Sequence, residues 1–224
     1  MKRILSIIAG ILAVASCEFP DANSFSVKNC GDYLNYKDGT LSNDYGTKLT
    51  VVEDQTDKNW AVEGSRMYAV FDVLNANYDV TLKSYMLATM KPVSGKFDDP
   101  TVEAADPIEI MDCSIAGFCL NVIFNYYYKE GSDVQHKTEL YYNDDKEILT
   151  LRLVHEGGGE SPVNFDADAL KTTSAVICFP LTNLIPEGEL RTVVIEYDYL
   201  TKDLNDQNIS VHTSKALYNQ QVLF

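Results

Sequence analysis

Gly117-Phe118-Cys119-Leu120-Asn121-Val122-Ile123-Phe124-Asn125-Tyr126-Tyr127-Tyr128 is the stretch of sequence that decides the fold. One face of this extended chain carries Phe118, Leu120, Val122, Phe124 and Tyr126, and the other carries Cys119, Asn121, Ile123 and Asn125. Side chains that alternate with a period of two form a β-strand with one face toward a core. The stretch therefore predicts a strand of a β-sandwich, with the Phe118-to-Phe124 face buried.

The same alternation recurs along the C-terminal half of the chain. Further strands are predicted at His136–Tyr142, Ile148–His155, Ala175–Leu181 and Thr192–Leu200, with turn residues between them. Short strands at this spacing are typical of an all-β sandwich. We expect residues 107–224 to form an antiparallel β-sandwich domain.

The N-terminal half predicts a second all-β unit. Strands are expected at Thr47–Glu53, Met67–Leu74 and Tyr78–Met90, and the middle one is apolar on both faces, as in a small closed barrel. Residues 30–93 are assigned to this domain. Residues 94–106, rich in Pro and Asp and poor in apolar residues, are predicted to form the linker.

The first residues predict an exported lipoprotein. Lys2 and Arg3 precede an apolar run, Ile4–Ala15, which is too short to span a bilayer. The run ends in Val14-Ala15-Ser16-Cys17, which resembles a bacterial lipobox. We expect residues 1–16 to be a signal peptide, Cys17 to carry the lipid that attaches the protein to the membrane, and residues 17–29 to be a tether.

The overall charge narrows the choice of partners. The chain of 224 residues has 18 Lys and Arg against 33 Asp and Glu, a net charge of −15. Such a chain is repelled by nucleic-acid backbones, so no nucleic-acid partner is expected. The hydrophobic content of 46% excludes a largely disordered protein.

Several segments resemble the NigD-like lipoprotein family of Bacteroidetes. They include Asp38-Gly39-Thr40-Leu41, Gly64-Ser65-Arg66-Met67, Asp106-Pro107-Ile108 and Leu149–His155, and the resemblance covers nearly the whole chain after Cys17. The resemblance implies a lipid-anchored protein with a small OB-type barrel followed by a β-sandwich. Members often carry a dense acidic run after the cysteine, whereas this chain has Glu18-Phe19-Pro20-Asp21. The family has no established biochemical activity, so the resemblance indicates architecture and location.

No catalytic or metal-binding motif is present. His136, His155 and His212 are widely separated, and His155 is interpreted as a structural histidine at the inward end of its strand. Asn164, Asp166 and Asp168 have the spacing that begins a calcium loop, but Ala169 and Ala175 replace the Gly and Glu that the loop requires. We predict no catalytic residues, no metal and no cofactor.

The cysteines after the lipobox leave their pairing open. Cys30, Cys113, Cys119 and Cys178 allow three disulfide pairings if all four are used, or can remain free. They form no CxxC pair, so neither a structural zinc site nor a redox centre is indicated.

The aromatic residues provide the functional hypothesis. Tyr127, Tyr128 and Trp60 are the candidate ligand-binding residues, because exposed Tyr and Trp make rigid amphipathic contacts. We expect a non-enzymatic, lipid-anchored protein of the outer membrane, facing the periplasm or the cell surface, that acts as a binding or assembly component. Its ligand is a protein or a glycan. The alternative is a cell-envelope hydrolase that uses carboxylates near His155.

Overall fold

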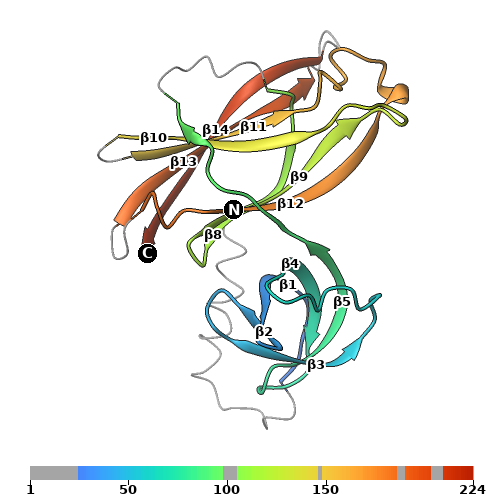
Figure 1. The fold of residues 1–224 in the computed structure, drawn as a ribbon, viewed down its shortest axis with the longest axis vertical. Helices are drawn as coiled ribbons and strands as arrows, with labels where there is room; N and C mark the ends of the chain where they lie inside the picture. The colour runs from blue at the N-terminus through green and yellow to red at the C-terminus, as the bar shows by residue number, and fades with distance from the viewer. Residues whose placement is uncertain (1–24, 98–104, 146–147, 186–189, 203–208, 224) are drawn as a thin grey trace. The chain divides into compact units, whose positions relative to one another are not determined.

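The protein consists of two compact units that divide between Leu87 and Ala88. The computed structural model describes residues 25–97, 105–145, 148–185, 190–202 and 209–223 (Figure 1). The predicted signal peptide and Cys17 lie outside these residues.

The first unit is a closed five-stranded barrel with the order β1-β2-β3-β5-β4. Its strands are β1 (Val27–Lys37), β2 (Thr40–Asn43), β3 (Lys48–Asp54), β4 (Arg66–Val73) and β5 (Asp79–Leu87). A two-residue turn joins β1 to β2, and both Asp38 and Gly39 adopt the positive φ that this turn requires. Along β4 the buried residues alternate from Met67 to Val73, and they form the barrel core with residues such as Leu34 and Leu82.

The second unit contains two sheets. One has the order β14-β13-β11-β10-β7 and the other the order β6-β12-β9-β8. The strands are β6 (Thr89–Met90), β7 (Gly95–Lys96), β8 (Glu109–Ala116), β9 (Cys119–Tyr128), β10 (Lys137–Asp144), β11 (Ile148–Glu156), β12 (Lys171–Pro180), β13 (Leu190–Lys202) and β14 (Ile209–Leu223). A 3-10 turn, η2 (Ala167–Ala169), precedes β12.

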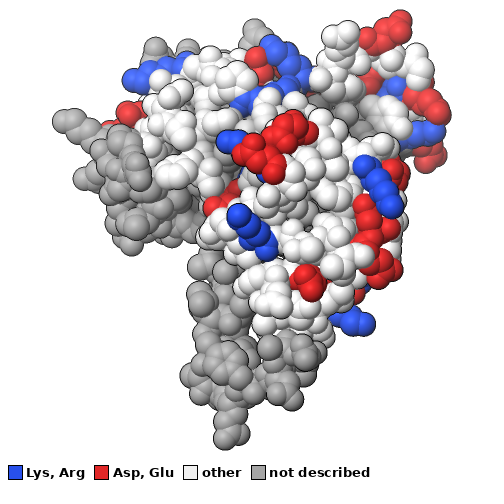
Figure 2. Space-filling view, turned by 60° about the horizontal axis from the view of Figure 1, so that its bottom comes forward, with Lys and Arg blue, Asp and Glu red and all other residues white. Residues whose placement is uncertain are grey.

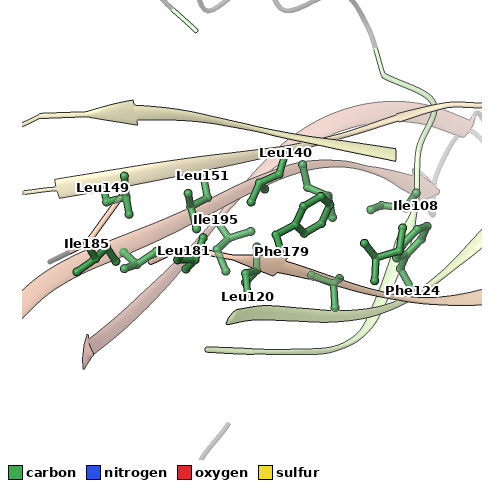
Figure 3. Close-up of a cluster of buried hydrophobic side chains, with 14 residues drawn as sticks. Ile108, Leu120, Phe124, Leu140, Leu149, Leu151, Phe179, Leu181, Ile185 and Ile195 are labelled. Carbon is green, nitrogen blue, oxygen red and sulfur yellow. The ribbon is translucent and has the colours of Figure 1, made fainter. Parts of the chain in front are cut away.

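One buried cluster contains residues of both sheets (Figure 3). Leu120, Phe124 and Phe179 come from the four-stranded sheet, and Leu140 and Leu151 come from the five-stranded sheet. The predicted core face of β9 is therefore buried from Leu120 to Phe124, and Tyr126 packs against it. Asn121 and Ile123 on the opposite face are buried too, so this strand does not present its other face to solvent along its whole length.

Two predictions about the second unit are wrong. Phe118 is 38% exposed, because Gly117 and Phe118 both have positive φ and form the two-residue turn between β8 and β9 instead of continuing the strand. The pairing is also not purely antiparallel, since β11 pairs with β13, β10 with β7 and β12 with β6 in parallel. Parallel pairs need a crossover connection, and β12 in the other sheet lies within the connection from β11 to β13.

The segment after the barrel is attached to the second unit. Backbone N–H groups of Lys91, Ser94 and Phe97 donate to carbonyl oxygens of Cys178, Leu140 and Tyr142. These bonds extend the second unit to residues that the sequence assigned to the barrel domain and to the linker of residues 94–106. Residues 98–104 of that predicted linker lie outside the described ones, so its extent stays a prediction.

Two surface properties bear on the environment of the protein. On the face shown in Figure 2, acidic and basic side chains of the described residues are interspersed. Within the described part of the chain, no helix has the length and apolar character needed to cross a bilayer.

Candidate functional site

The three predicted ligand contacts lie in different surroundings. Tyr128 is at the end of β9 and lines a pocket in the second unit. Tyr127 is half-buried and directed to the opposite face of β9, where it is paired with Thr172 of β12. Trp60 packs against the barrel core, donates from Nε1 to Asp54 Oδ2 at 2.8 Å, and meets the Tyr36 ring edge-on. The structure therefore does not bring the three together.

The hairpin of β10 and β11 brings His136 and His155 together. Thr138 lies opposite His155, so His136, two residues earlier, is a diagonal neighbour of His155 on the same face. The two rings stack with 5.3 Å between centroids, and the Tyr126 ring of β9 lies 4.8 Å from each of them. The pair is thus held between strands of both sheets.

Four side chains form a continuous series of hydrogen bonds, which we call the histidine chain: Glu160, His136, His155 and Thr138. His136 Nε2 is 3.3 Å from Glu160 Oε2, and His136 Nδ1 is 3.2 Å from His155 Nε2. His155 Nδ1 is 3.0 Å from Thr138 Oγ1. A neutral imidazole has one donor and one acceptor nitrogen. With Glu160 ionised and both rings neutral, each ring donates through Nε2 and accepts at Nδ1, and Thr138 donates to His155.

Burial and hydrogen bonding support the charge states of His155 and Glu160. Burial, reinforced by neighbouring His136, lowers the pKa of His155 to about 4, so its ring is neutral at pH 7. The nearby Asp106 carboxylate opposes this shift only in part. The pKa of Glu160 is lowered, first by the hydrogen bond from the Ser132 hydroxyl and then, against the effect of burial, by the Lys129 N–H and His136. Glu160 is therefore a carboxylate at neutral pH, although its side chain is only 4% exposed.

The loop after β11 positions Glu160. Asp106 Oδ2 accepts hydrogen bonds from the backbone N–H groups of Gly157, at 2.6 Å, and Gly159, at 3.0 Å. Gly157 lies so close to the rings that a Cβ there would be 2.7 Å from His136 Nδ1. The absence of a side chain at residue 157 therefore lets the loop approach the histidines and present Glu160 to His136.

A pocket of about 190 Å³ opens next to the histidine chain. Its lining combines two tyrosine rings with charged and hydroxyl-bearing side chains: Tyr126, Tyr128, Lys129, Ser132, Val134, His136, Glu160 and Thr173. Tyr126 and Tyr128 are on the same face of β9, and Thr173 of β12 is paired with Tyr126. His155 lies behind this surface and is 3% exposed.

The hydrogen bonds of the histidine chain limit its chemistry. A general base needs a ring nitrogen within reach of the proton that it removes. Both nitrogens of His136 and both of His155 already face protein partners. Among the described residues, no group of three or more His, Cys, Asp or Glu side chains is arranged to hold a metal ion. The arrangement is suited to binding more than to proton transfer.

The other chemistry-bearing residues have structural partners. Arg66 forms a buried bidentate ion pair with Asp44, with both N–O distances at 2.6 Å, inside the barrel unit. Cys119 and Cys178 are buried in the second unit, and Cys30 and Cys113 are partly buried. Neither group adds a second candidate site.

Sequence reasoning placed His155 at the inward end of its strand but missed its partner. The signal was available in the hairpin itself, since two consecutive antiparallel strands joined by a short turn bring residues near 136 opposite residues near 155. The position of Glu160 could not be predicted from strand pairing, because it depends on how Asp106 holds the loop after β11 against the histidine rings.

Comparisons with known proteins identify structures with a similar fold but indicate no activity. No protein-family model and no curated protein matches the chain. A crystal structure of a NigD-like immunity protein from Bacteroides caccae is similar with a TM-score of 0.55 at 19% identity, covering 89% of this chain and 99% of that one. The structure of a protein of unknown function from Bacteroides vulgatus is similar with a TM-score of 0.57 at 18% identity. The match covers 88% of this chain and 94% of that one. The structure of a candidate lipoprotein from Bacteroides fragilis is similar with a TM-score of 0.50 at 12% identity. The match covers 86% of this chain and 98% of that one.

These similarities extend over both units of the chain. At such low identities they show a shared fold alone. The resemblance to NigD-like proteins that the sequence motifs indicated is confirmed at the level of the fold.

Proposed function

We propose that this protein is a lipid-anchored component of the cell envelope that binds a protein or glycan ligand and catalyses no reaction. The pocket beside the histidine chain is the proposed contact site. The observation that carries the proposal is that the pocket gathers tyrosine rings and polar groups while both nitrogens of His136 are engaged in the protein. Such a site can hold a ligand, but its histidine is not positioned to accept a proton from one.

The proposal includes a location and an architecture. The lipobox at Cys17 and the fold shared with a candidate lipoprotein support attachment to the outer membrane, facing the periplasm or the cell surface. The strand order of the first unit supports an OB-type barrel. The buried cluster with members in both sheets supports a β-sandwich for the second unit.

One observation favours the alternative of a hydrolase. Carboxylates do lie near His155, as that hypothesis requires, since Asp106 acts on its pKa and Glu160 is bound to its neighbour His136. The hydrogen-bonding pattern weighs against it. The pocket is also smaller than the roughly 300–1,000 Å³ of most small-molecule sites, so it suits a single group of a larger ligand.

Crosslinking and affinity capture from intact cells test the proposal. The tagged protein is compared with Tyr128→Ala in the pocket, Tyr127→Ala on the other face of β9, and Met111→Ala, a control on β8 that is 59% exposed. We expect Tyr128→Ala to lose the captured partner and Met111→Ala to retain it, with similar melting temperatures. If only Tyr127→Ala loses the captured partner, the binding surface lies on the opposite face of β9. Retention in both tyrosine variants would contradict binding through either surface.

A further inference from the structure

The pocket carries one full charge of each sign. Glu160 contributes a carboxylate that is held ionised by hydrogen bonds from Ser132, the Lys129 N–H and His136. Lys129 also lines the pocket, and its Nζ lies 5.5 Å from the centre of the Phe165 ring. The rest of the lining consists of tyrosine, hydroxyl-bearing and apolar side chains, together with His136, which is hydrogen-bonded to Glu160.

This balance disfavours a charged ligand. Because Glu160 and Lys129 line the same pocket, a cationic ligand that Glu160 attracts is repelled by Lys129, and an anionic ligand that Lys129 attracts is repelled by Glu160. A neutral group whose hydroxyls can both donate and accept satisfies the two charges at once, because a hydroxyl donates to a carboxylate and accepts from an ammonium. Thr173 adds a hydroxyl to the same lining.

The tyrosines complement such a ligand. Tyr126 and Tyr128 lie two residues apart on one face of β9 and both line the pocket. An aromatic ring offers an apolar face and a polar tip, and it packs against the apolar C–H groups of a ring-shaped partner. The volume of about 190 Å³ is below the roughly 300–1,000 Å³ of most small-molecule sites, which favours one ring over an extended ligand.

We propose that the pocket binds a single neutral sugar ring of a glycan, between the Tyr128 ring and the opposed charges of Glu160 and Lys129. This inference rests on the proposed function and specifies the ligand class of the same site. It implies that the affinity depends little on salt concentration, since salt screens interactions between charges.

The test is an NMR titration of the protein without its signal peptide. The probes are three neutral methyl pyranosides, those of glucose, galactose and N-acetylglucosamine, with n-butylamine and inorganic phosphate as charged counterparts. The backbone amide of Lys129 and the ring signals of His136 report on the pocket. We expect at least one methyl pyranoside to bind with equal affinity at low and high salt.

Variants sharpen the test. Tyr128→Ala should weaken sugar binding by about tenfold through loss of the ring contact, while Met111→Ala should leave it unchanged. Lys129→Met keeps the backbone N–H that holds Glu160 but removes the ammonium, so it should weaken sugar binding and make the pocket accept n-butylamine.

The outcomes separate this inference from the proposed function. Binding of n-butylamine or phosphate by the wild-type protein, without binding of a neutral sugar, would overturn the sugar assignment, as would no binding of any probe up to tens of millimolar. Pocket-dependent capture of a partner from cells would in either case leave the proposed function standing and point to a protein ligand. Sugar binding that Tyr128→Ala leaves unchanged would place the sugar elsewhere and also overturn the inference.

Discussion

Gly157 is the residue on which the geometry of the histidine chain depends most directly. A Cβ at this position would lie 2.7 Å from His136 Nδ1 and 2.8 Å from His136 Cε1. The ring cannot retreat freely, because it is stacked on His155 and lies against Tyr126. The glycine is needed here for close approach, and the same loop carries Glu160 to the pocket.

We therefore predict that Gly157→Ala destabilises the second unit by about 1–3 kcal/mol, the usual effect of overpacking a well-packed site. The matched control is Gly95→Ala, since a Cβ at Gly95 meets nothing within 4 Å. Urea unfolding of both variants measures the difference. A Gly157→Ala variant as stable as Gly95→Ala would show that the rings are not held as described.

His155 makes stability depend on pH. Its pKa is about 4 in the folded protein, below its ordinary value of about 6.5, so the unfolded chain binds a proton between these pH values that the folded chain does not. The contribution of His155 to the free energy of unfolding is therefore fully present above about pH 6.5, and it is lost as the pH drops toward 4. We predict a loss of about 2 kcal/mol between pH 7 and pH 5 from this residue.

Denaturant unfolding of the wild-type protein and of His155→Gln at several pH values measures this contribution. The variant should lose most of the slope between pH 5 and 7. An equal slope in both proteins would assign the pH dependence to other groups.

At the scale of the elements, the short strands β6 and β7 assign residues 88–97 to the second unit. Both are only two residues long, yet they pair with β12 and β10. Three further backbone hydrogen bonds, from Lys91, Ser94 and Phe97, join the same segment to those strands. Val93 packs against the core cluster.

We predict that a fragment of residues 88–224 is more stable than a fragment of residues 105–224, which keeps Asp106, by about 3 kcal/mol or more, since each of these three hydrogen bonds contributes about 1 kcal/mol. Urea unfolding of the two fragments provides the comparison. Equal stabilities would mean that residues 88–97 contribute nothing to the unit and would favour the shorter domain predicted from sequence.

The elements also show what the sequence could and could not predict. β4, β9, β10 and β11 were predictable because apolar residues recur at alternate positions of each strand. β1 was not, since its buried residues lack a regular period and a register shift follows Val27. The parallel pairs and the joining of Glu160 to His136 depend on contacts between residues far apart in the chain, which periodicity does not report.

At the scale of the whole molecule, the negative net charge and the predicted lipobox both favour membrane attachment through a lipid. A net charge of −15 keeps a protein away from an anionic membrane surface, so the stable attachment that we propose requires the predicted lipid on Cys17. Each buried CH₂ of an acyl chain contributes about 0.8 kcal/mol, and several chains on one cysteine give firm attachment.

We predict that Cys17→Ala leaves the precursor uncleaved and without acyl chains. Mass spectrometry of the purified protein and fractionation of membranes measure processing and attachment. Wild-type processing and equal membrane retention of the variant would refute lipidation at Cys17.

We propose that the site binds a ligand and does not catalyse, because every ring nitrogen of His136 and His155 is engaged. The most direct measurement is the imidazole ¹⁵N NMR spectrum at about pH 8, well above the ordinary histidine pKa of about 6.5. We predict two neutral rings, each protonated at Nε2, with Nδ1 of His136 accepting from His155 and Nδ1 of His155 accepting from Thr138. A ring protonated at Nδ1, or a His136 nitrogen that exchanges freely with solvent, would contradict the account and return the site to the hydrolase alternative.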